Sequence, residues 1–190
     1  MKANTMKQRA SAGFTLIELV IVITIVGILA AVALPRFVNL QREARIAKLN
    51  AARGAMAAAA ALVHSKVLAA NGLADTNGCA GTPTLASNAA SGAGTVCSEH
   101  GLIATLHGYP ASAALSAANP GIVAAAGLTA IFNPSATDLS TEGYTVTVTG
   151  DITRVEVVGA QNPTLCFFTY TQPSAFGVAG AVSGVTTNGC

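Results

Sequence analysis

Three residues near the N-terminus, Gly13, Phe14 and Glu18, have types and a spacing that suit covalent processing followed by charge pairing. Cleavage between Gly13 and Phe14 would give Phe14 a free α-amino group, and Glu18 would lie about one helical turn away. A carboxylate in the first turn of a helix interacts favourably with the helix dipole. The amine of a neighbouring helix could neutralise it more fully, so the triple indicates an assembly site.

The element that carries Glu18 is an apolar run, Phe14 to Leu34, with Glu18 as its one charge. As a helix it would span roughly 30 Å, which is enough to cross a bilayer. A charge inside a membrane helix costs roughly 2.5–3.5 kcal/mol on insertion scales and by default marks a function. Lys2, Lys7 and Arg9 precede the run, so the positive-inside tendency places the N-terminus in the cytoplasm and exports the rest of the chain.

A cleaved secretory signal is the simpler alternative for this segment. Its apolar region would be shorter, roughly 7–15 residues, and a small-residue cleavage site would follow it. Here Pro35 and Arg36 follow the run, and the small residue Gly13 precedes it. A plain signal anchor stays open as an alternative, but it does not account for Gly13, Phe14 and Glu18 together.

Residues 13–19, GFTLIEL, resemble the N-terminal signature of the type IV pilins and their pseudopilin relatives, in which a basic leader ends in glycine before an aromatic residue. The resemblance implies that a prepilin peptidase removes residues 1–13 on the cytoplasmic side and methylates the amine of Phe14. It also implies that Glu18 pairs with the Phe14 amine of an adjacent subunit as a filament grows.

Gly27 and Pro35 fall where that family has a helix-weakening pair, a stretch that can be locally unwound in filaments. A simple packing kink is an equally good interpretation of the two residues, since proline removes one helical hydrogen bond. The leader is long for the family. Met6 could therefore be the true start in place of Met1.

A second helical pattern follows Pro35 and predicts one helix from Phe14 to about Ala70, ended by Asn71-Gly72. Apolar residues recur at three- and four-residue steps and predict one buried face. These residues are Phe37, Leu40, Ala44, Ala47, Ala51, Ala55, Ala58 and Leu62.

Beyond the helix the pattern predicts a surface loop over 73–98 and a short helix over 111–118 after Pro110. Alternating Val and Thr at 144–149 predict a strand, and 152–159 completes a hairpin across Gly150-Asp151. Segment 165–172 is a third strand and 182–190 a weaker fourth. We therefore expect an α+β fold in which a small antiparallel sheet packs on the second half of the helix.

This pattern suggests five segments along the chain: a cleaved leader, a membrane or filament-core half-helix, an amphipathic half-helix, a disulfide-stapled loop with a short helical region, and a sheet with a C-terminal disulfide loop. Their ranges are 1–13, 14–35, 36–72, 73–142 and 143–190.

Four cysteines, Cys79, Cys97, Cys166 and Cys190, lie in the exported part. An even number there favours disulfides, although four cysteines allow three pairings. We favour Cys79–Cys97 and Cys166–Cys190, because each closes a local loop of roughly twenty residues. No C-x-x-C pair is present, so a zinc site is not expected.

No group of residues predicts catalysis, a metal or a cofactor. Glu99, His100 and His107 fit no common metal spacing, and these histidines and His64 are expected to be surface residues. No GxSxG motif or phosphate-binding loop occurs. Charged residues make up 9% of the chain, the net charge is +2, and no basic block suggests nucleic-acid binding.

The resemblance extends to LPRFVNLQREAR, HGYP, CFFTYTQ and the terminal NGC, which look like the MSHA-type (mannose-sensitive haemagglutinin) pilins. It implies a homopolymeric surface fibre for attachment, and possible motility, built from subunits that wait in the inner membrane and meet a pilus assembly platform. A pseudopilin of a type II secretion system is the alternative. Residues 174–190 lack the acids that a pseudopilin calcium site would need. A monomeric membrane-anchored domain is a second alternative.

Overall fold

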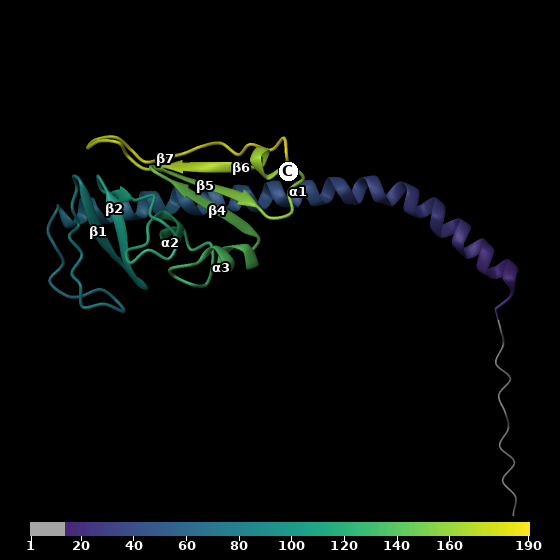
Figure 1. The fold of residues 1–190 in the computed structure, drawn as a ribbon, viewed down its shortest axis with the longest axis horizontal. Coiled ribbons are helices and arrows are strands. Elements are labelled where there is room, and N and C mark those ends of the chain that lie inside the picture. Colours follow the sequence, from purple (N-terminus) through teal and green to yellow (C-terminus); the bar gives the residue numbers. More distant parts are fainter. Residues whose placement is uncertain (1–13) are drawn as a thin grey trace, which may run out of the picture. The chain divides into compact units, whose positions relative to one another are not determined.

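The chain divides into two units, Met1–Gln41 and Arg42–Cys190, and the computed structural model describes residues 14–190. Helix α1, Leu16–Ala70, runs through both units (Figure 1). These bounds confirm the helix predicted from the sequence, including its end before Asn71, which adopts φ 50°.

In the first unit α1 is helical without a break, although Pro35 lies inside it. The locally unwound state that the family resemblance suggested for Gly27 and Pro35 is therefore absent from this structure. One proline removes one i→i−4 hydrogen bond, and the flanking turns keep theirs. A Cβ atom added at Gly27 would meet no neighbour within 4 Å among the described residues, so packing within this part of the chain does not require the glycine.

The second unit contains a four-stranded antiparallel sheet that lies along α1 (Figure 1). Its order is β4-β5-β6-β7, and the strands are Tyr144–Thr149, Ile152–Val157, Phe167–Thr171 and Ala181–Val182. Alternate residues of β4 and β5 are buried, as expected for a sheet with one face on a core. The α+β class and the hairpin of β4 and β5 are confirmed.

A second sheet was missed by the sequence analysis. Strands β1 (Ala93–Ser98), β2 (Gly101–Leu106) and β3 (Tyr109–Pro110) form an antiparallel three-stranded sheet; β1 lies at the end of the predicted surface loop 73–98, and no strand was predicted for β2 or β3. The segment is rich in glycine and alanine, which have weak strand propensity. Its strands are therefore specified by pairing and burial, which the local sequence does not show.

The predicted helix over 111–118 is wrong. Pro110 ends β3, and the backbone N–H of Ala111 then donates to Ala104 O at 2.9 Å, which continues the sheet pairing. Two other short helices occur, α2 (Ile122–Ala126) and α3 (Ala136–Thr141). Helix α3 begins with a capping box in which Ser135 and Asp138 satisfy each other's backbone N–H.

The core lies between α1 and the four-stranded sheet, and it corrects the predicted buried face of the helix. Leu49 and Met56 are fully buried against Phe168 and Tyr170. The predicted stripe turns outward, and Leu62, for example, is 69% exposed. Alanine and leucine occur on both sides of α1, so periodicity alone could not choose the face that the sheets cover.

Two disulfides join Cys79 to Cys97 and Cys166 to Cys190, which is the favoured pairing. The first ties the loop after α1 to β1. The second ties the segment after β7 to the residue before β6.

Candidate functional site

The start of α1 carries the residues to which the sequence assigned chemistry. Phe14 lies just before the helix and is 84% exposed. The Glu18 backbone N–H donates to Thr15 Oγ1 at 3.3 Å, so Thr15 caps the helix. Thr15 and Glu18 have the T-x-x-E spacing of a capping box, a signal that the sequence analysis missed. Within residues 14–190 the carboxylate of Glu18 accepts no hydrogen bond.

The other half of the predicted cleavage site, Gly13, lies outside the described residues, as do the rest of the leader (1–13) and both candidate start methionines. Cleavage and methylation therefore stay predictions. Phe14 is exposed, which is compatible with both.

The described part of the first unit is an apolar stretch of helix, and no other described segment packs on it. The large apolar side chains of α1 in this unit are exposed, from 43% at Val20 to 79% at Leu16. The one hydroxyl in the middle of the run, Thr24 Oγ1, donates to Ile21 O at 2.8 Å and so needs no outside partner. Among the described helices, α1 is long and apolar enough to cross a membrane, and its most apolar stretch is entirely unburied.

In the second unit α1 also has an exposed face, here called the outer face. It is built almost entirely from small apolar residues: Ala44, Ala47, Ala51, Ala58 and Leu62. This is the stripe that was expected to be buried. Small side chains allow another helix to approach closely. Both units thus present apolar helix surface without a partner inside the chain.

The cations of α1 hold the folded part to the helix. Arg45 donates to Cys190 O at 2.9 Å, Arg53 to Ser183 O at 2.6 Å and Lys66 to Cys97 O at 2.7 Å. Lys48 donates to Glu142 O and lies 4.7 Å from the centre of the Tyr144 ring. All of these acceptors are backbone carbonyls, so the basic side chains of α1 hold segments in and around the two sheets against the helix.

Two of the three histidines make specific contacts within the folded part of the chain. His64 stacks on Tyr109 with 3.9 Å between ring centres, and its Nδ1 lies 3.2 Å from Gly108 O. The Gly92 backbone N–H donates to His107 Nδ1 at 3.1 Å. Only His100 is a plainly exposed histidine. His64 and His107 are thus half-buried and support the β2–β3 turn, so they are less exposed than a plain surface position, whereas His100 is exposed as expected.

One group in the described residues has a metal-like composition, Asp75 with Cys79 and Cys97. Its two sulfurs are bonded to each other in a disulfide, so they are not available as thiolate ligands. The Asp75 carboxylate instead accepts from the Asn88 amide at 2.7 Å. This arrangement is structural.

Comparison with known protein families assigns residues 8–34 to the prokaryotic N-terminal methylation motif. The N-terminal segment carries this motif, as the resemblance to type IV pilins predicted. A stretch of 50 residues is also 54% identical to the Type IV narrow pilus major component PilA5 of Thermus thermophilus. That stretch covers 26% of this chain and 43% of the relative, so the chain matches less than half of the relative's length.

The matched motif overlaps the start of the apolar helix α1, and the two disulfides lie outside the residues that it covers. No solved structure matches the chain.

Proposed function

We propose that this chain is the structural major subunit of a type IV pilus, which polymerises through its N-terminal helix into a surface fibre. In this proposal a prepilin peptidase cuts between Gly13 and Phe14 and methylates the new amine. The subunit has no catalytic role of its own and binds no cofactor or metal.

The observation that carries the proposal is the combination of the prepilin motif with unpartnered apolar helix surface in both units. An exposed run of this kind is unstable in water. A bilayer can cover it before assembly, and other copies of the same helix can cover it afterwards. The outer face of α1, with its alanines and no charge, suits close helix–helix contact in the second environment.

Glu18 then sets the axial position of each subunit. In the low-dielectric interior of a helix bundle an unpaired carboxylate is costly, whereas one paired with the Phe14 amine of a neighbour is compensated. A register that pairs the charges is therefore favoured over slipped registers. Gly27 and Pro35 give α1 a weak point at which it can adapt during assembly.

The cellular route follows from the same parts. The prepilin is held in the inner membrane with its N-terminus in the cytoplasm, meets the assembly platform after processing, and ends in a surface pilus used for adhesion and possible motility. The segments HGYP, CFFTYTQ and NGC, which form the β2–β3 turn, strand β6 and the second disulfide, support placing it with the MSHA-type pilins.

Intact mass and N-terminal sequencing of protein from fibres sheared off cells test the proposal. We expect a chain that begins at N-methylated Phe14 in the sheared fraction. The same processed chain found only in the cell envelope would indicate a type II secretion pseudopilin instead. An unprocessed N-terminus would leave only a membrane-anchored domain.

The charge-pairing step predicts that Glu18→Ala keeps membrane insertion and leader cleavage but lowers the amount of fibre, because the neighbouring amine loses its partner. Quantitative blotting of sheared and membrane fractions measures this. Glu43→Ala is the matched control, since it removes another exposed acid of α1. Normal assembly of Glu18→Ala would disprove the role in registration.

A further inference from the structure

The turn that joins β2 to β3 is built from His107 and Gly108, which both have positive φ, 48° and 79°. A two-residue turn of this kind matches the twist of an antiparallel hairpin. Positive φ is ordinary for glycine but uncommon for other residues, so His107 needs contacts that hold it there. Both its backbone and its ring supply them.

Two hydrogen bonds join His107 to Gly92, the residue before β1. The backbone N–H of His107 donates to Gly92 O at 2.8 Å, and the Gly92 N–H donates to His107 Nδ1 at 3.1 Å. Because a backbone N–H can only donate, Nδ1 must accept, and the neutral ring therefore carries its proton on Nε2. A second proton on the ring would go to Nδ1 and remove this bond.

His64 of α1 contacts the same turn with the opposite tautomer. Its ring stacks on Tyr109 with 3.9 Å between ring centres, and its Nδ1 lies 3.2 Å from Gly108 O. A carbonyl oxygen only accepts, so His64 Nδ1 donates and keeps this bond when the ring gains a second proton. Of the two histidines, His107 is therefore the one whose hydrogen bond requires a neutral ring.

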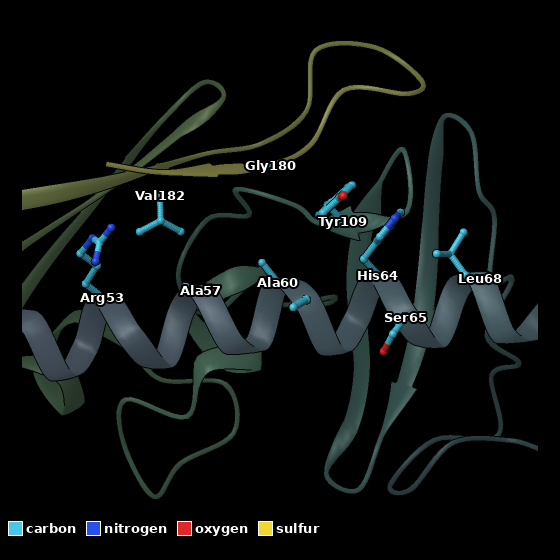
Figure 2. Close-up of a pocket in the computed structure, with 10 residues that line it drawn as sticks. Arg53, Ala57, Ala60, His64, Ser65, Leu68, Tyr109, Gly180 and Val182 are labelled. Carbon is cyan, nitrogen blue, oxygen red and sulfur yellow. The ribbon is translucent and has the colours of Figure 1, made fainter. Parts of the chain in front are cut away.

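The turn lines a groove beside α1, which consists of two adjoining hollows of about 450 and 230 Å³. Both hollows include His64, Leu68 and Tyr109, and Figure 2 shows the His64 and Tyr109 side chains next to each other beside the helix. The second hollow is also lined by His107 and Phe176. Movement of the turn would therefore change the shape of the groove.

Gly108 packs directly on α1. A Cβ atom built at this glycine would lie 3.4 Å from Val67 Cγ1, and Val67 is 1% exposed. The turn thus covers part of the apolar surface of the helix. If the turn moved away, Val67 would meet solvent and the groove would widen.

The hollow that includes His107 has no Lys, Arg, Asp or Glu side chain among the described residues that line it. Its other titratable groups are His64 from α1 and Tyr109 from β3, and neither Ala90 nor segment 176–179 adds one. A protonated His64 would repel a positive charge on His107. The lining therefore favours the neutral ring.

The charged groups of the neighbouring segments are engaged elsewhere. Arg53 and Lys66 of α1 donate to backbone carbonyls, and the Asp75 carboxylate accepts from the Asn88 amide. Within the described residues, no acid is recorded in contact with His107 to stabilise its protonated form.

We propose that His107 is a pH-sensitive switch in the second unit. With a neutral ring it holds the β2–β3 turn on α1, and with a protonated ring it releases the turn and opens the groove over Val67. Histidine ordinarily changes charge between about pH 5 and 8. Since the closed turn needs the neutral ring, its stability is present above this titration and is lost as the pH falls through it. The inference does not rest on the proposed function, because it concerns a turn within one chain.

Nitrogen-15 NMR of the full chain in detergent, labelled at histidine, shows which ring nitrogen carries the proton. At about pH 7.5 we expect a proton on Nε2 of His107 and on Nδ1 of His64. At about pH 5 both nitrogens of His107 should be protonated. A proton on His107 Nδ1 at the higher pH would overturn the proposal, and this measurement needs no variant.

Amide hydrogen exchange measures the release of the turn in the same sample. The protection of the Gly92 amide, corrected for the intrinsic effect of pH on exchange, should fall about three- to tenfold from about pH 7.5 to about pH 5, as for the loss of one hydrogen bond. Carboxylates stay mostly ionised over this range, so their titration contributes little.

His107→Asn is the decisive variant. Asparagine tolerates positive φ, and its side-chain oxygen can accept the Gly92 N–H without titrating, so the protection should not change with pH. His100→Asn is the matched control, since His100 is exposed and its loss should leave the wild-type response intact. A wild-type protection that does not depend on pH, or a full response in His107→Asn, would overturn the proposal.

Discussion

At the scale of single residues, Tyr170 links the two sheets. It is fully buried in β6, and its hydroxyl donates to Pro110 O of β3 at 2.6 Å. Burial raises the pKa of the Tyr170 hydroxyl well above its usual range, and nearby Tyr109 raises it further. The hydroxyl therefore stays protonated and remains a donor throughout the neutral range.

Replacing Tyr170 by phenylalanine should lower the free energy of unfolding by about 1–3 kcal/mol, because the carbonyl of Pro110 loses its buried donor. Denaturant unfolding of the detergent-extracted subunit measures the change. Tyr144→Phe is the matched control, since the Tyr144 hydroxyl has no hydrogen bond recorded in the described part of the chain. Equal losses for the two variants would contradict the link.

Asp138 makes the stability of α3 depend on pH. Hydrogen bonds from the side chain and backbone of Ser135 hold the pKa of this carboxyl below its usual value of 3.8. A lowered folded-state pKa contributes stability that is present above the unfolded value and is lost as the pH falls through the folded one.

We therefore expect wild-type thermal stability to fall as the pH drops below about 4. The Asp138→Asn variant should lose less stability on acidification, because its side chain is neutral at every pH. Its melting temperature at pH 7 should already lie below that of the wild type. Melting temperatures from pH 7 to 2.5 check this. Parallel wild-type and variant profiles would mean that Asp138 contributes nothing to the acid response.

At the scale of elements, α1 has two apolar faces with different tasks. Met56 represents the face that the sheets bury, and Leu62 represents the outer face, which no part of the described chain covers. The same helix thus serves a core and an exposed surface, which explains why apolar residues surround it.

Substitutions on the buried face should lower stability, whereas substitutions on the outer face should lower fibre assembly. Met56→Ala should cost about 2–5 kcal/mol of unfolding free energy, as large-to-small changes in cores do. Leu62→Ala should change that quantity by no more than about 0.5 kcal/mol but lower the fibre yield. Chemical unfolding and sheared-fibre blots of both variants give the comparison. A normal yield for Leu62→Ala would remove the outer face from the assembly surface.

At the scale of the whole molecule, the C-terminal segment is held from two sides. The Cys166–Cys190 disulfide joins it to the sheet across 24 residues, and Arg45 of α1 donates to Cys190 O. Strand β7 itself has only two residues, Ala181–Val182. The disulfide and the Arg45 hydrogen bond therefore hold this segment in place of the backbone hydrogen bonds that a longer β7 would make.

Cys190→Ser should lower the free energy of unfolding by about 3 kcal/mol, the loop-closure value for a bridge of this span. It should also make the segment after β6 sensitive to protease. Leader cleavage should be unaffected, because the peptidase site is at the other end of the chain. Limited proteolysis with N-terminal sequencing checks both points, and unchanged protease resistance would argue against a structural role for the bridge.

Local patterns explain which parts of this fold were predictable. The α1 helix has a long apolar period and an Asn-Gly stop, and β4 and β5 have strict alternation, so each is specified by neighbours in sequence. Strands β1–β3 and helix α2 lack such signals, and the capping box of α3 was overlooked. Tyr109 and Pro110, for instance, look like a turn and become a strand only because β2 pairs with them.

The sequence by itself indicated the N-terminal methylation motif, the length of α1 and the favoured pairing of the cysteines, because each depends on residue type and spacing along the chain. Only the tertiary structure decided which face of α1 is buried, and that the groove beside it is walled by Tyr109 and Phe176. These properties depend on which distant segments pack on the helix. Because alanines occur all around α1, its own sequence does not show which face is buried. The sheets decide this, and their position depends on contacts between residues far apart in the sequence.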